Sequence, residues 1–203
     1  MSKIRVVQWG TGSVGRTLLR QIIDQDVYEL AGVYVTSDAK VGLDAGEIAK
    51  RPPTGIRATN RIEDILALDA DIVLHTSLIS VPYDAQNAVI SQLLASGKNV
   101  ISSNGFYRPD MHGDAYAAPL RAAAQAGGST LAGIGLNPGF MAERVMLTLS
   151  GVVSRMTEMR CREVFDASQS PSPGLVFNAM GFGTDPARKD LTTSPVARLY
   201  DQL

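Results

Sequence analysis

Short apolar runs alternate with amphipathic runs along residues 4–135, and this alternation restricts the possible folds more than any other feature of the chain. The apolar runs predict buried strands at residues 4–9, 29–35, 71–75, 99–103 and 129–135. Between them, apolar residues at helical spacing predict helices at residues 13–24, 62–68, 82–97 and 113–127. Strands that alternate with helices pair in parallel, and the helices cover both faces of the sheet. The sequence therefore predicts an α/β fold with a Rossmann-type, doubly wound parallel sheet.

The alternation ends near Asn137 and divides the chain into two regions. We expect a Rossmann domain over residues 1–136 and the start of a second, α+β domain over residues 137–203. The elements predicted in the second region are a helix at residues 141–154, a strand at residues 157–168 and a helix at residues 194–203. Subtracting 136 from 203 leaves 67 residues, which are too few for an independent substrate domain. We therefore expect the second domain to be truncated.

The sequence GTGSVG, residues 10–15, lies directly between the first predicted strand and the first predicted helix. This is the context in which a G-x-G-x-x-G motif binds a dinucleotide. Gly10 would permit the tight turn, Gly12 would let a pyrophosphate approach the backbone, and Gly15 would let the helix pack close to the strand. The helix N-terminus would then face the phosphates. The loop residues expected to contact the cofactor are Gly10, Thr11, Gly12, Ser13, Val14 and Gly15.

The end of the second predicted strand favours NADP over NAD. An NAD site usually has Asp or Glu there, about 20 residues beyond the glycines, to bind the ribose hydroxyls. In this chain Thr36 and Ser37 occupy the strand end, Asp38 comes one residue late, and Lys40 is nearby. Hydroxyl groups and a cation suit a 2′-phosphate, although a solvated turn would have the same composition. We expect NADP as the cofactor, with NAD as the alternative.

The amino-acid composition limits which partners the protein can bind and in which cellular compartment it can function. The 203 residues carry a formal net charge of -1 and contain no basic run, which argues against nucleic-acid binding. A single cysteine, Cys161, excludes an internal disulfide framework and fits a reducing compartment. No apolar segment is long enough to span a membrane, and two distant histidines offer no metal-ligand spacing. We expect a cytoplasmic homodimer that acts on a small molecule and binds no metal, nucleic acid or membrane.

Polar residues follow the later predicted strands, at the edge of the sheet where doubly wound folds bind ligands. They are His75, Thr76, Ser77, Ser103, Asn104 and Asn137. His75 is either a proton donor or a hydrogen-bonded structural histidine. Asn104 could orient the nicotinamide amide or a substrate amine, or could simply form a turn. Asn137 could donate to the cofactor or the substrate, or could form the turn that joins the domains.

Several segments resemble the dihydrodipicolinate reductase-like superfamily of NAD(P)-binding enzymes. The segments TSDAKVGLDAGEIA, NVISSNGF and LNPGFMAERV, at residues 36–49, 99–106 and 136–145, are similar to three of its loops. These are the loop after the second strand, the turn beside the nicotinamide, and the turn into the second domain. NPGF, EVFDAS and a Gly-Phe-Gly turn at residues 181–183 resemble most closely the branch of diaminopentanoate dehydrogenases and native amine dehydrogenases. The resemblance implies an NAD(P)-dependent oxidoreductase.

Two departures from these families leave the reaction open. The His-His-x-x-Lys motif of true dihydrodipicolinate reductases is replaced by REVFDASQSPSPG at residues 162–174. Asn104, Gly105 and Phe106 stand where characterised amine dehydrogenases have a Glu. Tyr107 is a candidate general acid, and Asp166 a candidate ligand for a substrate ammonium. We predict hydride transfer at an amine or imine carbon. The alternatives are carbonyl reduction on the same fold and dinucleotide binding without catalysis.

Overall fold

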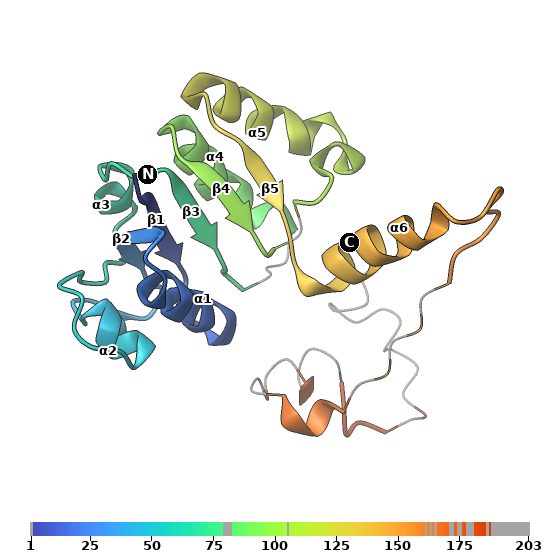
Figure 1. Cartoon of the computed structure of the whole chain (residues 1–203), viewed down its shortest axis with the longest axis horizontal. Coiled ribbons are helices and arrows are strands. Elements are labelled where there is room, and N and C mark those ends of the chain that lie inside the picture. The colour runs from blue at the N-terminus through green and yellow to red at the C-terminus, as the bar shows by residue number, and fades with distance from the viewer. Residues whose placement is uncertain are drawn as a thin grey trace.

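The computed structural model describes residues 2–78, 83–104, 106–160, 162, 164, 166–170, 173, 176–177, 181–185 and 187. Its centre is a parallel five-stranded sheet with strand order β2-β1-β3-β4-β5 (Figure 1). The strands are β1 (Ile4–Trp9), β2 (Tyr28–Tyr34), β3 (Ile72–His75), β4 (Asn99–Ser102) and β5 (Leu131–Gly133). The predicted parallel sheet is confirmed. Strand β1 is an interior strand that pairs with β2 and β3, and its residues 6–9 are buried because helices cover both faces of the sheet.

Helices cover both faces of the sheet (Figure 1). A separate cluster of buried side chains fills each interface between helices and sheet. On one face α1 (Ser13–Asp24) and α2 (Ala45–Ala49) pack through Leu19 and Ile48 against Val33. On the other face, Ile65, Ile90 and Leu120 belong to the cluster formed with α3 (Ile62–Leu66), α4 (Asn87–Ala95) and α5 (Asp114–Gly127). The sheet is therefore wound in both directions from a switch point between β1 and β3, where such folds bind ligands.

The motif GLDAGE, which carries much of the family resemblance, has a structural role. Asp44 caps the short helix α2, which the sequence analysis did not predict. Its carboxylate accepts hydrogen bonds from the backbone N–H groups of Gly46, Thr54 and Gly55 at 2.7, 2.9 and 2.8 Å, and from the Thr54 hydroxyl at 3.2 Å. These bonds hold the pKa of Asp44 below its usual value. Asp44 thereby fixes the loop that follows β2.

The region after β5 departs from the sequence expectation. A π-helical segment spans Leu136–Met146 and continues into α6 (Leu147–Ser150), so the helix begins before the predicted residue 141. The strand predicted at residues 157–168 is wrong for those of its residues that the structure describes, which are irregular apart from a 3-10 turn at Ala167–Gln169. Alternating hydrophobicity alone does not form a strand without a neighbouring strand to pair with. The helix predicted at residues 194–203 lies outside the described residues, and the boundary at residues 136–137 stays a prediction.

No helix in the described ranges is both long and apolar enough to cross a bilayer.

Candidate functional site

The three motif glycines have the geometries that a phosphate-binding loop needs. Gly10 has φ = 88°, and a Cβ there would lie 3.0 Å from the carbonyl oxygen of Thr76. A Cβ on Gly15 would lie 2.1 Å from the Gly10 carbonyl oxygen, so helix α1 can approach the loop only with glycine at that position. A Cβ on Gly12 would meet nothing within 4 Å. The loop is closed behind Gly10 and Gly15 and open in front of Gly12.

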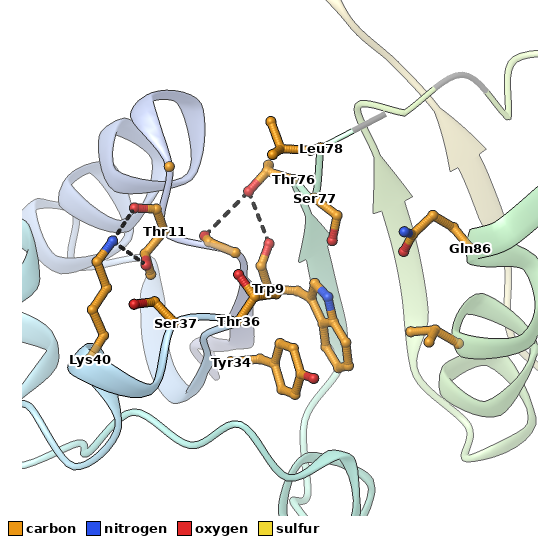
Figure 2. Close-up of a pocket in the computed structure, with 13 residues that line it drawn as sticks. Trp9, Thr11, Tyr34, Thr36, Ser37, Lys40, Thr76, Ser77, Leu78 and Gln86 are labelled. Atoms are coloured by element: carbon orange, nitrogen blue, oxygen red, sulfur yellow. Dashed lines mark hydrogen bonds between the residues drawn. The ribbon is translucent and has the colours of Figure 1, made fainter. Parts of the chain in front are cut away.

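A cavity of about 580 Å³ lies beside this loop at the carboxyl ends of β1, β2 and β3 (Figure 2). Its volume falls within the roughly 300–1,000 Å³ that is typical of small-molecule and cofactor sites. The residues that line it are Trp9, Gly10, Thr11, Gly12, Tyr34, Thr36, Ser37, Lys40, Thr76, Ser77, Leu78, Gln86 and Val89. The cavity thus brings together eight of the predicted cofactor residues, whereas Ser13, Val14, Gly15 and Ser103 are not in its lining.

The rim of the cavity beside Gly12 is electropositive. Gly12 is the N-cap of α1, whose first turn contains no acidic residue, so the positive end of the helix dipole is uncompensated there. Lys40 donates from Nζ to the carbonyl oxygen of Thr11 at 3.0 Å and to its hydroxyl at 3.1 Å (Figure 2). Within the described ranges, Lys40 forms no ion pair with a carboxylate. Its charge is therefore available to an anion at the loop.

The opposite wall of the cavity is aromatic and apolar. The rings of Trp9 and Tyr34 stack with centroids 3.6 Å apart and an interplanar angle of 12°. Leu78 and Val89 add aliphatic surface elsewhere in the lining. Gln86 adds a polar side chain (Figure 2). Sequence reasoning missed all five of these lining residues. Trp9 could have been found, because it ends the strand immediately before Gly10.

His75 lies fully buried behind the cavity wall and does not line the cavity. Its Nδ1 is 2.9 Å from the Ser102 hydroxyl and its Nε2 is 3.1 Å from the Ser77 hydroxyl. Burial lowers the pKa of His75 to about 4, and a hydrogen bond with Gln86 opposes that shift. The imidazole is neutral at pH 7, which favours the structural alternative for His75. Ser77, whose hydroxyl contacts His75, is itself a residue of the cavity lining.

The two candidate asparagines differ in what the structure describes. Asn104 is only 6% exposed, and its side-chain amide donates to the carbonyl oxygen of Leu78 at 3.1 Å. Its backbone N–H donates to the Ser102 hydroxyl at 3.1 Å. Asn104 therefore ties the loop after β4 to the loop after β3. The backbone of Asn137 lies in the π-helical segment, and its side chain lies outside what the structure describes.

A second cavity of about 280 Å³ lies at the end of β5. It is lined by Tyr107, Gly133, Ile134, Gly135, Gly139, Phe140 and Arg144. Tyr107 packs so closely on Gly135 that a Cβ there would lie 2.6 Å from its hydroxyl oxygen. Asp166 lines neither cavity, and its exposed carboxylate accepts the backbone N–H of Ser168 at 2.9 Å. Among the described residues, no three His, Cys, Asp or Glu side chains group as metal ligands.

Fold, glycine loop and cavity together define the class of this chain: a Rossmann-type domain with a G-x-G-x-x-G loop at the switch point of its sheet. No family model matches the sequence. The chain is 34% identical over 184 residues to an amine dehydrogenase from Streptomyces virginiae, an alignment that covers 89% of this chain and 51% of the relative. The chain thus spans about half the length of the curated relative that it matches.

The fold is also similar to the solved structure of an amine dehydrogenase from Mycobacterium smegmatis. The TM-score is 0.69 at 21% identity, and the match covers 76% of this chain and 45% of that chain. The sequence similarity to the Streptomyces protein confirms the predicted resemblance to amine dehydrogenases. The structural similarity confirms the Rossmann-type fold.

Proposed function

We propose that this chain binds a nicotinamide dinucleotide in the cavity beside the glycine loop. The observation that carries the proposal is the open space over Gly12, next to the N-terminus of α1 and the ammonium of Lys40. A helix N-terminus with nearby glycines and a cation suits a pyrophosphate, because backbone N–H groups and positive charge both face the anion. The wall formed by Trp9 and Tyr34 suits a flat base.

NADP is the proposed form of the cofactor, with NAD as the alternative. Thr36 and Ser37 are exposed at the cavity end of β2, where the adenosine ribose binds in Rossmann folds. The carboxylate of Asp38 accepts a hydrogen bond from Asn60 at 3.0 Å, and Asp38 does not line the cavity. These features support a 2′-phosphate contact with the hydroxyls and with Lys40, since no carboxylate lines the cavity at that point.

The proposed reaction is NAD(P)-dependent hydride transfer at a carbon bonded to nitrogen. The cofactor supplies the hydride, and the protein positions it and excludes water. An imine accepts hydride without a strong acid, and the main cavity offers neutral groups, which are Thr76 and Ser77 after β3 and Gln86 before α4. His75 would remain neutral and hold the Ser77 hydroxyl in place. The name of the Streptomyces relative, an amine dehydrogenase, supports the same reading.

Carbonyl reduction is the second candidate, and one observation favours it. A ketone or aldehyde needs a proton donor at its oxygen. The Tyr107 side chain lines the cavity at the end of β5 and could supply that proton. A dinucleotide-binding role without turnover is the third candidate. The homodimer, the cytoplasmic location and the small-molecule substrate remain part of the proposal.

The test begins with binding and ends with turnover. Calorimetric titration with NAD and NADP measures the affinity for each cofactor. Cofactor oxidation is then followed with aldehydes and ketones, with and without ammonia. Turnover that requires ammonia supports reaction at a C–N centre, and turnover that is indifferent to ammonia supports carbonyl reduction. Binding without turnover supports the non-catalytic role, and no binding to either dinucleotide refutes the proposal.

A further inference from the structure

Gln8 is a fully buried polar residue in the middle of the sheet. It lies in β1, which pairs with β2 on one side and with β3 on the other. Its neighbours Val6, Val7 and Trp9 are buried and apolar, as expected for a central parallel strand. A buried amide at this position needs an explanation, because a buried polar group costs stability unless hydrogen bonds offset its desolvation.

The side-chain amide of Gln8 is directed at the glycine loop. Its Nε2 donates to the carbonyl oxygen of Gly10 at 2.9 Å and to the Thr76 hydroxyl oxygen at 2.9 Å. The Thr76 hydroxyl in turn donates to the carbonyl oxygen of Trp9 at 2.9 Å. A carbonyl oxygen can only accept, so the atom of Gln8 that faces Gly10 is the amide nitrogen. Gln8 and Thr76 together hold the backbone where β1 enters the loop.

The other end of this amide shows that stability alone does not account for Gln8. No group in the described part of the chain donates to Gln8 Oε1, which is buried. An unpaired buried acceptor destabilises the fold, and an apolar residue of similar size would avoid that desolvation cost. The benefit of glutamine must come from the contacts of its nitrogen, and those contacts are with the loop.

The carbonyl of Gly10 also determines the direction of the next N–H group. Carbonyl and N–H of one trans peptide point in opposite directions. With the Gly10 oxygen held toward Gln8, the N–H of Thr11 points away from Gln8. No described group accepts a hydrogen bond from that N–H, although Thr11 is buried and lines the cavity. An anionic oxygen at the loop would be a suitable acceptor.

We propose that Gln8 and Thr76 are positioning residues that orient the Gly10–Thr11 peptide toward the phosphates of the dinucleotide. This inference rests on the dinucleotide binding proposed above. Neither side chain needs to touch the phosphates, since both act through the Gly10 carbonyl and the strand end.

The experiment compares Gln8→Met, which keeps the size and removes the donor, with Thr76→Val and Thr76→Ser. Thr76→Ser retains the hydroxyl and serves as the conservative rescue. Val73→Ala, a core substitution in β3 that is not in the cavity lining, is the matched control for stability. Calorimetry gives the affinity for NADP and NAD, thermal unfolding gives the stability, and amide hydrogen exchange without ligand reports the backbone of residues 9–13.

We expect Gln8→Met and Thr76→Val each to weaken dinucleotide binding about tenfold and to speed exchange at residues 10–13, because each removes hydrogen bonds that hold the loop. The double variant should lose less than the product of the single losses, since both act on one network. Thr76→Ser should recover most of the affinity that Thr76→Val loses, and Val73→Ala should bind as the original chain does. Wild-type affinity and exchange in Gln8→Met would overturn the inference. If the original chain binds no dinucleotide, the proposed function fails, and the ligand-free exchange still tests the positioning role.

Discussion

Replacing Gly12 by Asp should raise the stability of the fold and weaken cofactor binding. The two effects have separate causes at one position. Gly12 is the N-cap of α1, has φ = -70°, and leaves open space for a side chain. Asp is among the best N-cap residues, and its charge interacts favourably with the helix dipole, so we expect a gain of about 0.5–1 kcal/mol in the free energy of unfolding.

The same carboxylate would stand where the pyrophosphate is proposed to bind. Two unit charges about 4 Å apart repel by roughly 1–4 kcal/mol, depending on how strongly water screens them. This corresponds to a loss of roughly 5- to 1,000-fold in affinity. Gly12→Asn is the matched control, because it has nearly the same shape without the charge. The loss of affinity in Gly12→Asn measures the steric contribution of the new side chain alone.

The assay combines urea unfolding with calorimetric titration of NADP at low and high salt. We expect the difference between Gly12→Asp and Gly12→Asn to shrink at high salt, because ions screen the repulsion. Affinity of Gly12→Asp within about a factor of two of the original chain would refute the placement of the phosphates over Gly12. Lower stability in both variants would refute the argument that this position is open.

Three further predictions concern charged or titratable side chains. Lys40→Ala should weaken NADP binding by about 1.5–3 kcal/mol and NAD binding by less, because a lysine–phosphate hydrogen bond is charge-assisted. Calorimetric titration with both cofactors checks this prediction. Equal losses of affinity for NADP and NAD would contradict the 2′-phosphate contact. Asp44→Asn should lower the free energy of unfolding at pH 7, because the amide cannot accept all the bonds that the carboxylate accepts. Since the pKa of Asp44 is lowered from 3.8 in the folded state, its stabilisation is present above that value and is lost as the pH falls through the lower, folded pKa. Urea unfolding at several pH values should therefore show the two proteins converging in acid, and a constant gap would count against the hydrogen-bond explanation. His75 should stay neutral in an NMR titration until the pH approaches about 4. In the unfolded chain the imidazole of His75 takes up a proton near pH 6.5, so the free energy of unfolding should fall as the pH drops from 6.5 toward 4. A pKa near 6.5 in the folded protein would show that the ring is not desolvated.

The dinucleotide binding proposed for this chain depends on features that arise at two levels, local sequence and tertiary packing. The local level was predictable. The buried run of β1, the spacing of Gly10, Gly12 and Gly15, and the helical periodicity of α1 are all set within about 20 consecutive residues, so sequence periodicity and turn chemistry are sufficient to predict them. The alternation of strands and helices likewise determined the parallel sheet, because parallel neighbours require crossover helices.

The same local reasoning failed where a pattern needed a distant partner. Residues 157–168 alternate like a strand, yet their described members form none, since pairing is decided by what lies beside a segment and not by its own composition. GLDAGE was predicted as a family motif, but nothing local indicated that Asp44 would bind the backbone of Thr54 and Gly55.

The functional detail of the site was decided by the tertiary structure alone. Gln8 contacts Thr76 across 68 positions, Lys40 contacts Thr11 across 29, and His75 contacts Ser102 across 27. Each pair meets because the strand order β2-β1-β3-β4 brings the carboxyl ends of neighbouring strands to one edge of the sheet. The sequence could place His75 at that edge of the sheet. It could not show that the His75 side chain lies behind the cavity wall, because the burial of that side chain depends on neighbours from other strands and loops. The sequence by itself therefore predicted the glycine loop and the sheet edge at which we propose that a dinucleotide binds, and the packing of the sheet decided which side chains line the cavity there.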